Sequence, residues 1–231
     1  MRPEFRKPNV KYPILENYLN YTFLRLQDQD KIYKSEDGVH CLFNTGLLTP
    51  DEKELFALFE ANHRAGQDEK ANDWFFKGFF DSYARELSHY RQSLPQLATY
   101  VTDASDLVLD TSFSIDTNVS HIIDEPENQA RLPDVLRNNR TLALAAIEGA
   151  TTFLKQKVVR NYKTAIPQWY NQRIQLLLPL CLVSPDKADL ALVAEKDKAG
   201  LVYRIRTALR MDMAYSNARL ITKPDRDWLN P

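Results

Sequence analysis

The stretch RIQLLLPLCLVSPDKADLALVAEKDKAGLVYRIRTAL, residues 173–209, decides the fold of this chain. It holds three apolar runs, 173–183, 189–196 and 201–209, and the polar turns SPDK and DKAG separate them. Short apolar runs between turn residues are typical of strands, and their close succession favours an antiparallel meander. Because Pro179 has no backbone N–H, we expect the first run to be an edge strand or a bulged strand.

Helical patterns flank this meander. Residues 14–27 and 141–162 carry apolar side chains at helical spacing, and the second segment gives the clearer signal. On the second helix, the apolar side that we expect to face the protein core consists of Leu142, Ala146, Ala150, Phe153 and Leu154.

A third helix is expected over residues 49–62, TPDEKELFALFEAN, because Thr49 suits an N-cap, Pro50 the first helical position and Glu52 a capping box. Segments 31–35 and 38–44 flank a Glu-Asp-Gly turn signal and predict a hairpin. We further expect a buried strand at 74–80, a short helix within 81–100 before Pro95, and a short strand at 106–110.

These elements mix helices and strands without regular βαβ alternation, which favours the α+β class. We expect a single domain over residues 13–231, with mixed helices packed on a largely antiparallel sheet and a C-terminal three-stranded meander. Residues 1–12, which are charged and rich in proline, are expected to form an N-terminal arm.

The composition narrows the classes of function. The formal net charge of the 231 residues is −1, so no overall positive field recruits nucleic acid, and an anion site must depend on a local patch. We expect no membrane segment and no secretory signal, and hence a cytoplasmic protein. Cys41 and Cys181 stand in apolar runs without zinc-type spacing, so neither a zinc site nor a nucleophilic thiolate is expected. Metal-independent chemistry is preferred, and a magnesium site stays open as the alternative, formed by scattered acidic residues such as Asp103, Asp106, Asp110 and Asp116. We expect no cofactor.

The segment LKQKVVRNYKTAIPQWYNQR, residues 154–173, is the first candidate for a binding site, because it combines cations with aromatic residues and has no acidic residue. Cations bind phosphates, and aromatic faces stack on bases. The alternative is that the cations complement a helix C-terminus and that the aromatic rings belong to the core. Its cationic and aromatic side chains are Lys155, Lys157, Arg160, Lys163, Arg173, Tyr162, Trp169 and Tyr170.

His121, in the loop-like NVSHIIDE, is the preferred proton-transfer residue among the four histidines, because phosphodiester cleavage near neutral pH needs an acid or base of this kind. Its alternative role is a hydrogen bond to a backbone carbonyl. In FNTGL, Asn44, Thr45 and Gly46 lie where a turn presents backbone N–H groups to an anion. A tight connection that tolerates positive φ is the alternative there.

The stretch MDMAYSNARLI, residues 211–221, sorts its side chains better as a helix than as a strand. Asp212, Tyr215 and Arg219 then share one stripe, and Asn217 falls on the apolar side. Because a buried amide without a partner costs about 1–3 kcal/mol, Asn217 must bond to backbone, water or ligand. Arg219 is expected either to pair with Asp212 or to hold a phosphate.

Four strings together are similar to a known family: CLFNTGLLTPDEKELFALFEAN, NYKTAIPQWY, IQLLLPLCLVSPDKADLALVAEK and MDMAYSNARLITKPDRDWL. They resemble a mostly bacterial family of domains of unknown function, number thirty-eight twenty-five, over about Ile14 to Leu229. Members look like a module that travels with cold-shock and LOTUS-type RNA-binding domains. The resemblance therefore implies an RNA or nucleotide context, although this chain has no recognisable segment of either type.

Two hypotheses follow. The first is a metal-independent phosphodiesterase or nucleotide hydrolase, in which His121 is the acid or base and Lys163 and Arg219 stabilise phosphate charge. The second is a non-catalytic module that recognises RNA or a small nucleotide through the same cations and aromatics. A homodimer is possible in either case. The residues expected to position the substrate are Asn44, Thr45, Gln168, Trp169, Asp212, Tyr215 and Asn217.

Overall fold

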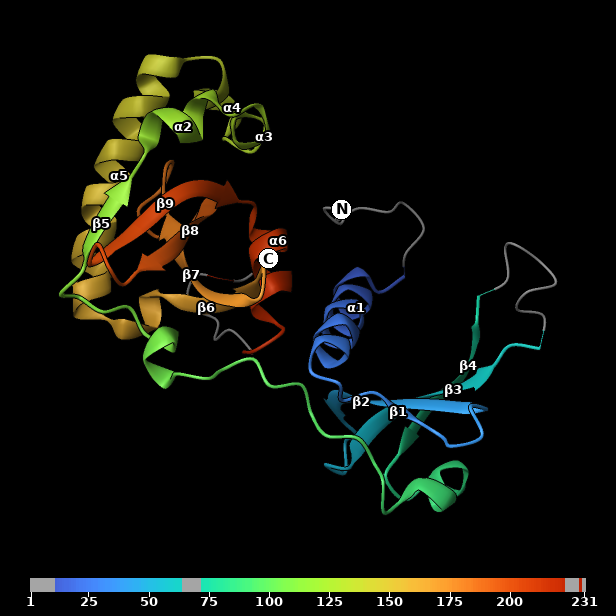
Figure 1. The fold of residues 1–231 in the computed structure, drawn as a ribbon. Coiled ribbons are helices and arrows are strands. Elements are labelled where there is room, and N and C mark those ends of the chain that lie inside the picture. The colour runs from blue at the N-terminus through green and yellow to red at the C-terminus, as the bar shows by residue number, and fades with distance from the viewer. Residues whose placement is uncertain (1–10, 64–71, 223–228, 230–231) are drawn as a thin grey trace. The chain divides into compact units, whose positions relative to one another are not determined.

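The computed structural model describes residues 11–63, 72–222 and 229 (Figure 1). Contacts between Cα atoms divide the described chain into two compact units, an N-terminal unit of residues 11–99 and a C-terminal unit from residue 100 onward. Each unit combines helices with a sheet. All strand pairs of the described residues are antiparallel except one, the parallel pair of β5 and β9. The predicted α+β class is confirmed, whereas a single domain over 13–231 stays a prediction, and most of the predicted arm lies outside the described residues.

The N-terminal unit places one helix and one 3₁₀ turn around a four-stranded antiparallel sheet in the order β1-β2-β3-β4. One face of the sheet packs Phe43 and Ala57 against Leu26 of the helix, and the other packs Phe56 and Leu58 against the 3₁₀ turn. The elements are α1 (Pro13–Asp28), β1 (Tyr33–Lys34), β2 (His40–Leu48), β3 (Glu54–Ala61), β4 (Trp74–Asp81) and η1 (Arg85–Tyr90). The helix at 14–27, the β1–β2 hairpin and a short helical turn before Pro95 are thus confirmed.

The helix predicted over 49–62 is wrong, because this segment forms the β2–β3 turn and then β3. The Thr49 N–H donates to the Lys53 carbonyl at 2.9 Å, and the Lys53 N–H donates to Thr49 Oγ1 at 3.1 Å. The presumed capping residues therefore close a hairpin. β3 is hydrogen-bonded on both edges and covered on both faces, so its apolar residues do not alternate, and such a run resembles a buried helix.

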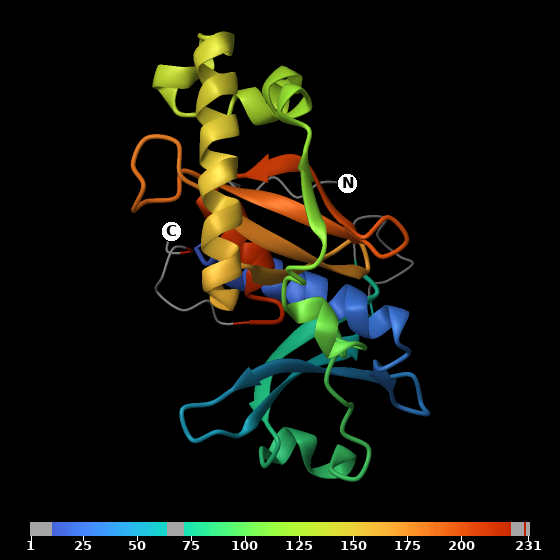
Figure 2. The same cartoon turned by 90° about the vertical axis from the view of Figure 1, so that its left-hand side faces the viewer.

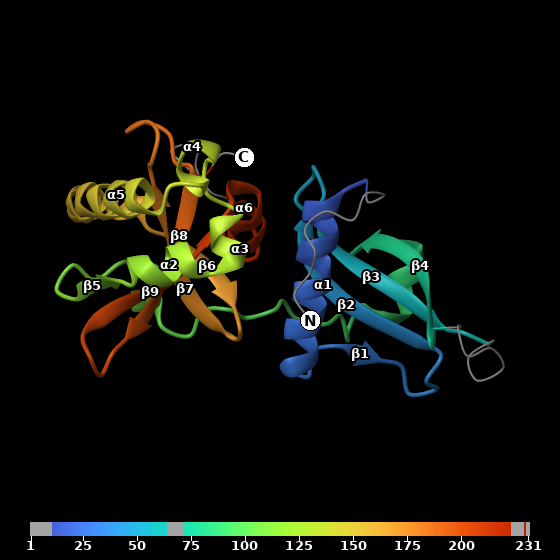
Figure 3. The ribbon, with the colours of Figure 1, turned by 90° about the horizontal axis from the view of Figure 1, so that it is seen from above.

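The C-terminal unit is a five-stranded sheet in the order β5-β9-β8-β7-β6, with helices on both faces. Figure 2 shows α5 running across one face of this sheet, and Figure 3 shows α5 and α6 on opposite sides of it. Its strands are β5 (Ser114–Thr117), β6 (Ile166–Tyr170), β7 (Arg173–Leu180), β8 (Leu190–Asp197) and β9 (Val202–Leu209). Its helices are η2 (Ala104–Leu107), α2 (Val119–Asp124), α3 (Pro126–Gln129), α4 (Asp134–Arg137), α5 (Arg140–Arg160), η3 (Tyr162–Thr164) and α6 (Met211–Ala218).

Strands β7, β8 and β9 form the predicted antiparallel meander. The expectation that the first of them lies at an edge is wrong, because β6 pairs with it on the other side. Pro179 is nevertheless tolerated, because its missing N–H is not needed for pairing on one side. The last residue of β7 that pairs with β6 is Leu177, so Pro179 has a strand neighbour on one side only, β8.

Two further predictions need correction. Residues 106–110 form no strand, because Asp106 and Leu107 belong to the 3₁₀ turn η2, where Asp106 forms ion pairs with Lys196 and Lys198. β4 is a strand as predicted, but it is an edge strand with exposed phenylalanines rather than a buried one. None of the described helices is long and apolar enough to cross a membrane.

An ion pair joins the end of α2 to the start of α5. Arg140 Nε and an Arg140 terminal nitrogen donate to the two Asp124 carboxylate oxygens at 2.9 and 3.0 Å. The hydrogen bond with Arg140, and its charge, lower the pKa of Asp124, and the nearby His121 acts in the same direction. Both partners are exposed, so the pair contributes little to stability at neutral pH.

We expect carboxyl NMR titration to give Asp124 a midpoint below the ordinary value of about 3.9, because protonation breaks the bonds to Arg140. The pair contributes to stability above the unfolded-state pKa, and this contribution is lost as the pH falls through the lowered pKa of the folded state. Arg140→Ala should move the midpoint back up. Arg137→Ala, which removes the partner of Asp134 instead, should leave it in place.

Candidate functional site

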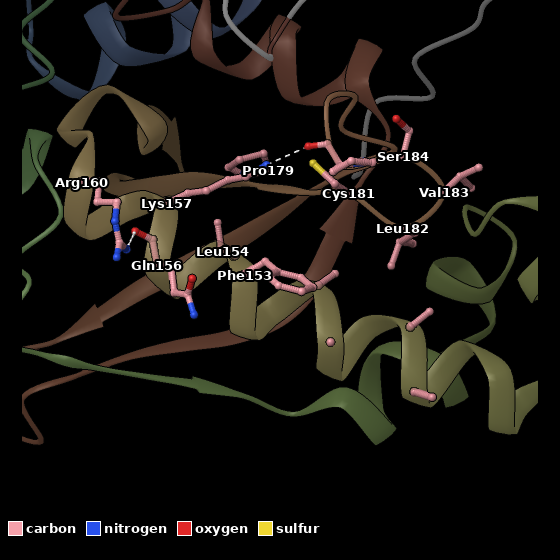
Figure 4. A pocket seen from close by; sticks show the side chains of 15 residues that line it. Phe153, Leu154, Gln156, Lys157, Arg160, Pro179, Cys181, Leu182, Val183 and Ser184 are labelled. Atoms are coloured by element: carbon pink, nitrogen blue, oxygen red, sulfur yellow. Dashed lines mark hydrogen bonds between the residues drawn. The ribbon is translucent and has the colours of Figure 1, made fainter.

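A groove of about 610 Å³ runs between α5 and the loop that follows β7 (Figure 4). Its volume falls in the range of small-molecule binding sites. One wall is the α5 face that carries Phe153, Lys157 and Arg160, and the opposite wall is the loop at residues 181–185. Toward the N-terminal half of α5, small residues line the groove. A Cβ added at Gly149 would meet no atom within 4 Å, so there is open space at this position. The groove therefore owes its width to small side chains on the helix.

Hydrogen bonds hold the loop wall in place. The Asp189 carboxylate accepts from the N–H groups of Leu182 and Val183 at 2.7 and 3.0 Å. The Asp189 N–H in turn donates to the Leu180 carbonyl at 3.0 Å, where β7 ends. Lys157 Nζ donates to the Pro185 carbonyl at 2.8 Å and ties the loop to α5, as the dashed line in Figure 4 shows. The wall is thus fixed from both sides of the groove.

Two cations lie at the C-terminal end of α5. Arg160 bonds to the Gln156 carbonyl of its own helix at 2.8 Å, and Figure 4 shows Arg160 near Gln156 and Lys157. Cations in the last turn of a helix also offset the negative end of its dipole, so part of their role is structural. Phe153, Lys157 and Arg160 nevertheless follow one another at i, i+4 and i+7, which places a ring and two charges on one face.

Cys181 lies in the groove but lacks the properties of a nucleophile. Burial raises the pKa of its thiol, and Lys157 offsets this only in part, which keeps the thiolate scarce at neutral pH. Burial also raises the pKa of Cys41. The expectation that neither cysteine is a good nucleophile agrees with these shifts.

A second polar feature is a chain of buried amides on the other face of the sheet. Asn217 Nδ2 on α6 donates to Gln168 Oε1 on β6 at 3.2 Å, and Gln168 Nε2 donates to Gln175 Oε1 on β7 at 2.8 Å. Gln175 Nε2 then donates to Glu195 on β8 at 2.7 Å, and Arg173 donates to the same oxygen at 3.1 Å. All the amide donors point toward one carboxylate, an order in which neighbouring bonds strengthen one another.

This row of amides shows which group binds the buried Asn217 amide: its partner is a protein side chain, Gln168. The amides of Asn217, Gln168 and Gln175 are all buried, so their bonds fix α6 on the sheet. The structure therefore supports a structural role for Gln168 and Asn217, and a role in ligand binding stays a prediction. Sequence reasoning missed Gln175 and Glu195, although a glutamine at the head of an apolar strand is an available signal.

The three predicted catalytic residues do not share one site. His121 is exposed on α2, whose Ile122 and Ile123 belong to the core on the α5 face of the sheet. Arg219 follows α6, which packs on the opposite face, and donates to the Thr222 carbonyl at 3.4 Å. Lys163 is exposed in η3, between α5 and β6, and does not line the groove.

The remaining predicted residues are held by internal contacts. The Trp169 ring meets the Tyr100 ring edge to face, with centroids 5.5 Å apart. The predicted helix over MDMAYSNA is confirmed as α6, with Tyr215 packed into the core beneath it. Asp212 pairs with Arg210 at 3.4 Å, whereas Arg219 donates to the Thr222 carbonyl. Of the two alternatives for Arg219, the pair with Asp212 is therefore not formed, and phosphate binding stays a prediction.

Asn44 and Thr45 lie in the N-terminal unit, and both are almost fully buried. Asn44 Nδ2 donates to Glu54 at 3.0 Å, and the Thr45 hydroxyl donates to the Leu55 carbonyl at 2.7 Å. Gly46 has φ of +73°, and a Cβ there would lie 2.6 Å from the Tyr18 hydroxyl. These contacts belong to an irregularity inside β2, where the pairing with β3 shifts register between Asn44 and Leu48. The tight strand-to-helix connection, which was the alternative to an anion site, is therefore wrong, because a strand follows in place of the helix.

Within the described ranges, no group of three His, Cys, Asp or Glu side chains is placed to hold a metal ion. The groove itself was not expected from the sequence, because it depends on how α5 is rotated on the sheet. Its available signals are the small residues of α5 and the turn SPDK, which together leave space beside the helix.

Comparison with known proteins gives the family. Neither a comparison with curated proteins nor one with solved structures finds a match. The family model described as a domain of unknown function (DUF3825) matches residues 4–228, and the chain therefore belongs to that family.

Proposed function

We propose that the chain is a binding module for RNA or a small nucleotide, and that the groove beside α5 is its site. The observation that carries the proposal is the row Phe153, Lys157 and Arg160, which lines a groove of about 610 Å³. Lys157 and Arg160 belong to the acid-free basic stretch 154–173. The RNA context that the family resemblance implies is an expectation in the same direction.

The spacing of this row suits a nucleotide. At a rise of about 1.5 Å per residue, Lys157 lies about 6 Å along the helix axis from Phe153, and Arg160 about 10 Å. A base stacked on the exposed Phe153 ring would place its phosphate toward the two cations. Arg160 offers a planar set of donors that matches phosphate oxygens, whereas Lys157 offers a point charge.

Catalysis is a separate proposal with weaker support, because the described residues bring no acid–base pair into the groove. His121, Lys163 and Arg219 lie on separate elements, so a joint role in phosphodiester cleavage stays a prediction. A turnover assay on cyclic and linear oligonucleotides tests it, with His121→Ala as the variant. Equal turnover by variant and wild type would remove the role assigned to His121.

The compartment we propose is the cytoplasm. Both cysteines are free thiols, which fits a reducing environment. A binding partner there would be an RNA or a soluble nucleotide.

We expect fluorescently labelled single-stranded RNA to bind the wild-type chain with an affinity that falls as salt rises, because phosphate contacts release counterions. Lys157→Ala combined with Arg160→Ala should weaken binding about tenfold and reduce the salt slope by about 2, one for each lost contact. Phe153→Ala should weaken binding by a similar factor while leaving the slope unchanged, because stacking carries no charge. Unlabelled mononucleotides serve as competitors in the same anisotropy titration.

The matched control is Lys155→Ala, which removes an exposed cation of the same helix that does not line the groove. It should leave both affinity and slope close to wild type. If Lys155→Ala weakens binding as much as the groove variants do, the cations act as a diffuse charge and the groove is not the site. Absence of binding at low salt by both RNA and mononucleotides would overturn the proposed function itself.

A further inference from the structure

Strand β4 forms one edge of the four-stranded sheet, and among the described residues only β3 pairs with it (Figure 1). Proteins usually protect such an edge with charges, prolines or very short strands, because its unpaired backbone groups bind other strands. β4, with the sequence WFFKGFFD, has eight residues and no proline. Its lysine, Lys77, is paired with Glu60 at 2.7 Å. The remaining protection is Asp81, at the last position of the strand, and a bulge near Gly78.

The hydrogen bonds at the two ends of β4 show which of its backbone groups face away from β3. The Ser82 N–H donates to the Glu54 carbonyl, and the Asn62 N–H donates to the Asp73 carbonyl. In an antiparallel pair, hydrogen-bonded and non-bonded residue pairs alternate. Counting inward from each end with the observed register, Phe79 and Phe76 are both non-bonded positions. Their N–H and C=O groups therefore point outward from the sheet edge.

The side chains of these two residues lie on one face and form an exposed aromatic row. Phe76 and Phe79 are 44% and 45% exposed, and their ring centroids lie 4.9 Å apart. Phe59 on β3 continues the row, 5.2 Å from Phe76. On the opposite face of the strand, Phe75 is 60% exposed. An added strand would thus gain backbone hydrogen bonds and aromatic contacts at the same positions.

We propose that this edge binds the same edge of a second copy of the chain, so that two β4 strands pair in antiparallel fashion. A two-fold axis at the bulge places Phe76 of each copy opposite Phe79 of the other, and aromatic pairs across strands are favourable. The bulges then lie together at the centre, where neither disturbs the pairing of the other. Because the net charge is −1, two copies repel one another only weakly.

The exposed area is consistent with a dimer of modest size. With about 200 Å² for a phenylalanine side chain, Phe75, Phe76 and Phe79 expose about 300 Å² per copy, or about 600 Å² for two. Small stable interfaces bury about 1,200 Å² in total, so neighbouring side chains and the backbone edge must supply a similar area. We therefore expect dissociation at micromolar rather than nanomolar concentration.

The test is the mass of the full chain by sedimentation over a range of concentrations. Wild type should move from 26.8 kDa toward twice that value as concentration rises into the micromolar range. Phe76→Lys combined with Phe79→Lys should remain at 26.8 kDa over the same range, with an unchanged circular dichroism spectrum. The control Val135→Lys alters an exposed residue of α4 in the other unit, and it should associate as wild type does.

Hydrogen exchange of the wild type locates the interface without any substitution. If β4 pairs with a second copy, exchange of the outward-pointing amides of Phe76 and Phe79 slows as concentration rises, while the β1 edge is unaffected. A wild-type chain that stays monomeric at 100 micromolar overturns the proposal. So does a dimer whose β4 amides exchange equally fast at all concentrations, because that dimer uses another surface.

Discussion

Gln168→Met should lower the free energy of unfolding by about 2–6 kcal/mol, although methionine has nearly the same length and fits an apolar environment. The substitution removes one acceptor and one donor from the amide chain, and so leaves Asn217 Nδ2 and Gln175 Oε1 without their partners. Both residues are buried, and each unsatisfied group costs about 1–3 kcal/mol. Urea unfolding measures the effect as a shift of the midpoint with an unchanged slope.

A double-mutant cycle separates the energy of the amide hydrogen bonds from the general cost of changing a buried residue. Asn217→Leu alone leaves Gln168 Oε1 unpaired, but in the combined variant the two new apolar side chains face one another. The double variant should therefore lose less than the sum of the two single losses. Gln156→Leu, on the exposed face of α5, should change stability by less than about 0.5 kcal/mol. If the two single losses add up in the double variant, the amide side chains are not energetically coupled, and this prediction is wrong.

Ile147→Ala should destabilise the chain by about 2–5 kcal/mol, because Ile147 is fully buried where α5 packs on the sheet. Leu142→Ala on the same helix should cost less than about 0.5 kcal/mol, since Leu142 is 48% exposed. Thermal or urea unfolding gives both values. Similar losses for the two variants would contradict the rotation of α5 on the sheet and, with it, the groove.

This pair of variants also tests what the sequence could not resolve. The apolar positions of α5 admit two faces, and the sequence predicts the one with Leu142, Ala146, Ala150, Phe153 and Leu154. In the structure Leu154 is buried and the two alanines pack against the core, but Leu142 and Phe153 are 48% and 65% exposed. Periodicity gives the presence of a helix, but alanines fill both sides of this one, so the pattern alone does not select the face that packs. The buried stripe is Ala143, Ile147, Thr151, Leu154 and Val158.

The candidate site, too, is predicted by the sequence only where the signal is local. The basic stretch 154–173 was recognised, and two of its cations line the groove. The opposite wall, held by Asp189, comes from a turn about thirty residues further along the chain, and no local pattern relates the two. The sequence predicts Gln168 and Asn217 as ligand-binding residues, but a polar side chain is equally what an internal series of amide hydrogen bonds requires.

By itself, the sequence determined those elements whose signal is local. The meander of β7, β8 and β9, the β1–β2 hairpin, and helices α1, α5 and α6 follow from short-range periodicity and turn residues, which act within a few positions of the chain. Only the tertiary structure decided that 54–61 is a strand, which face of α5 is buried, and what Asn217 binds. Each of these depends on neighbours distant in sequence, because strand pairing and amide bonding are satisfied by whichever groups the fold brings near.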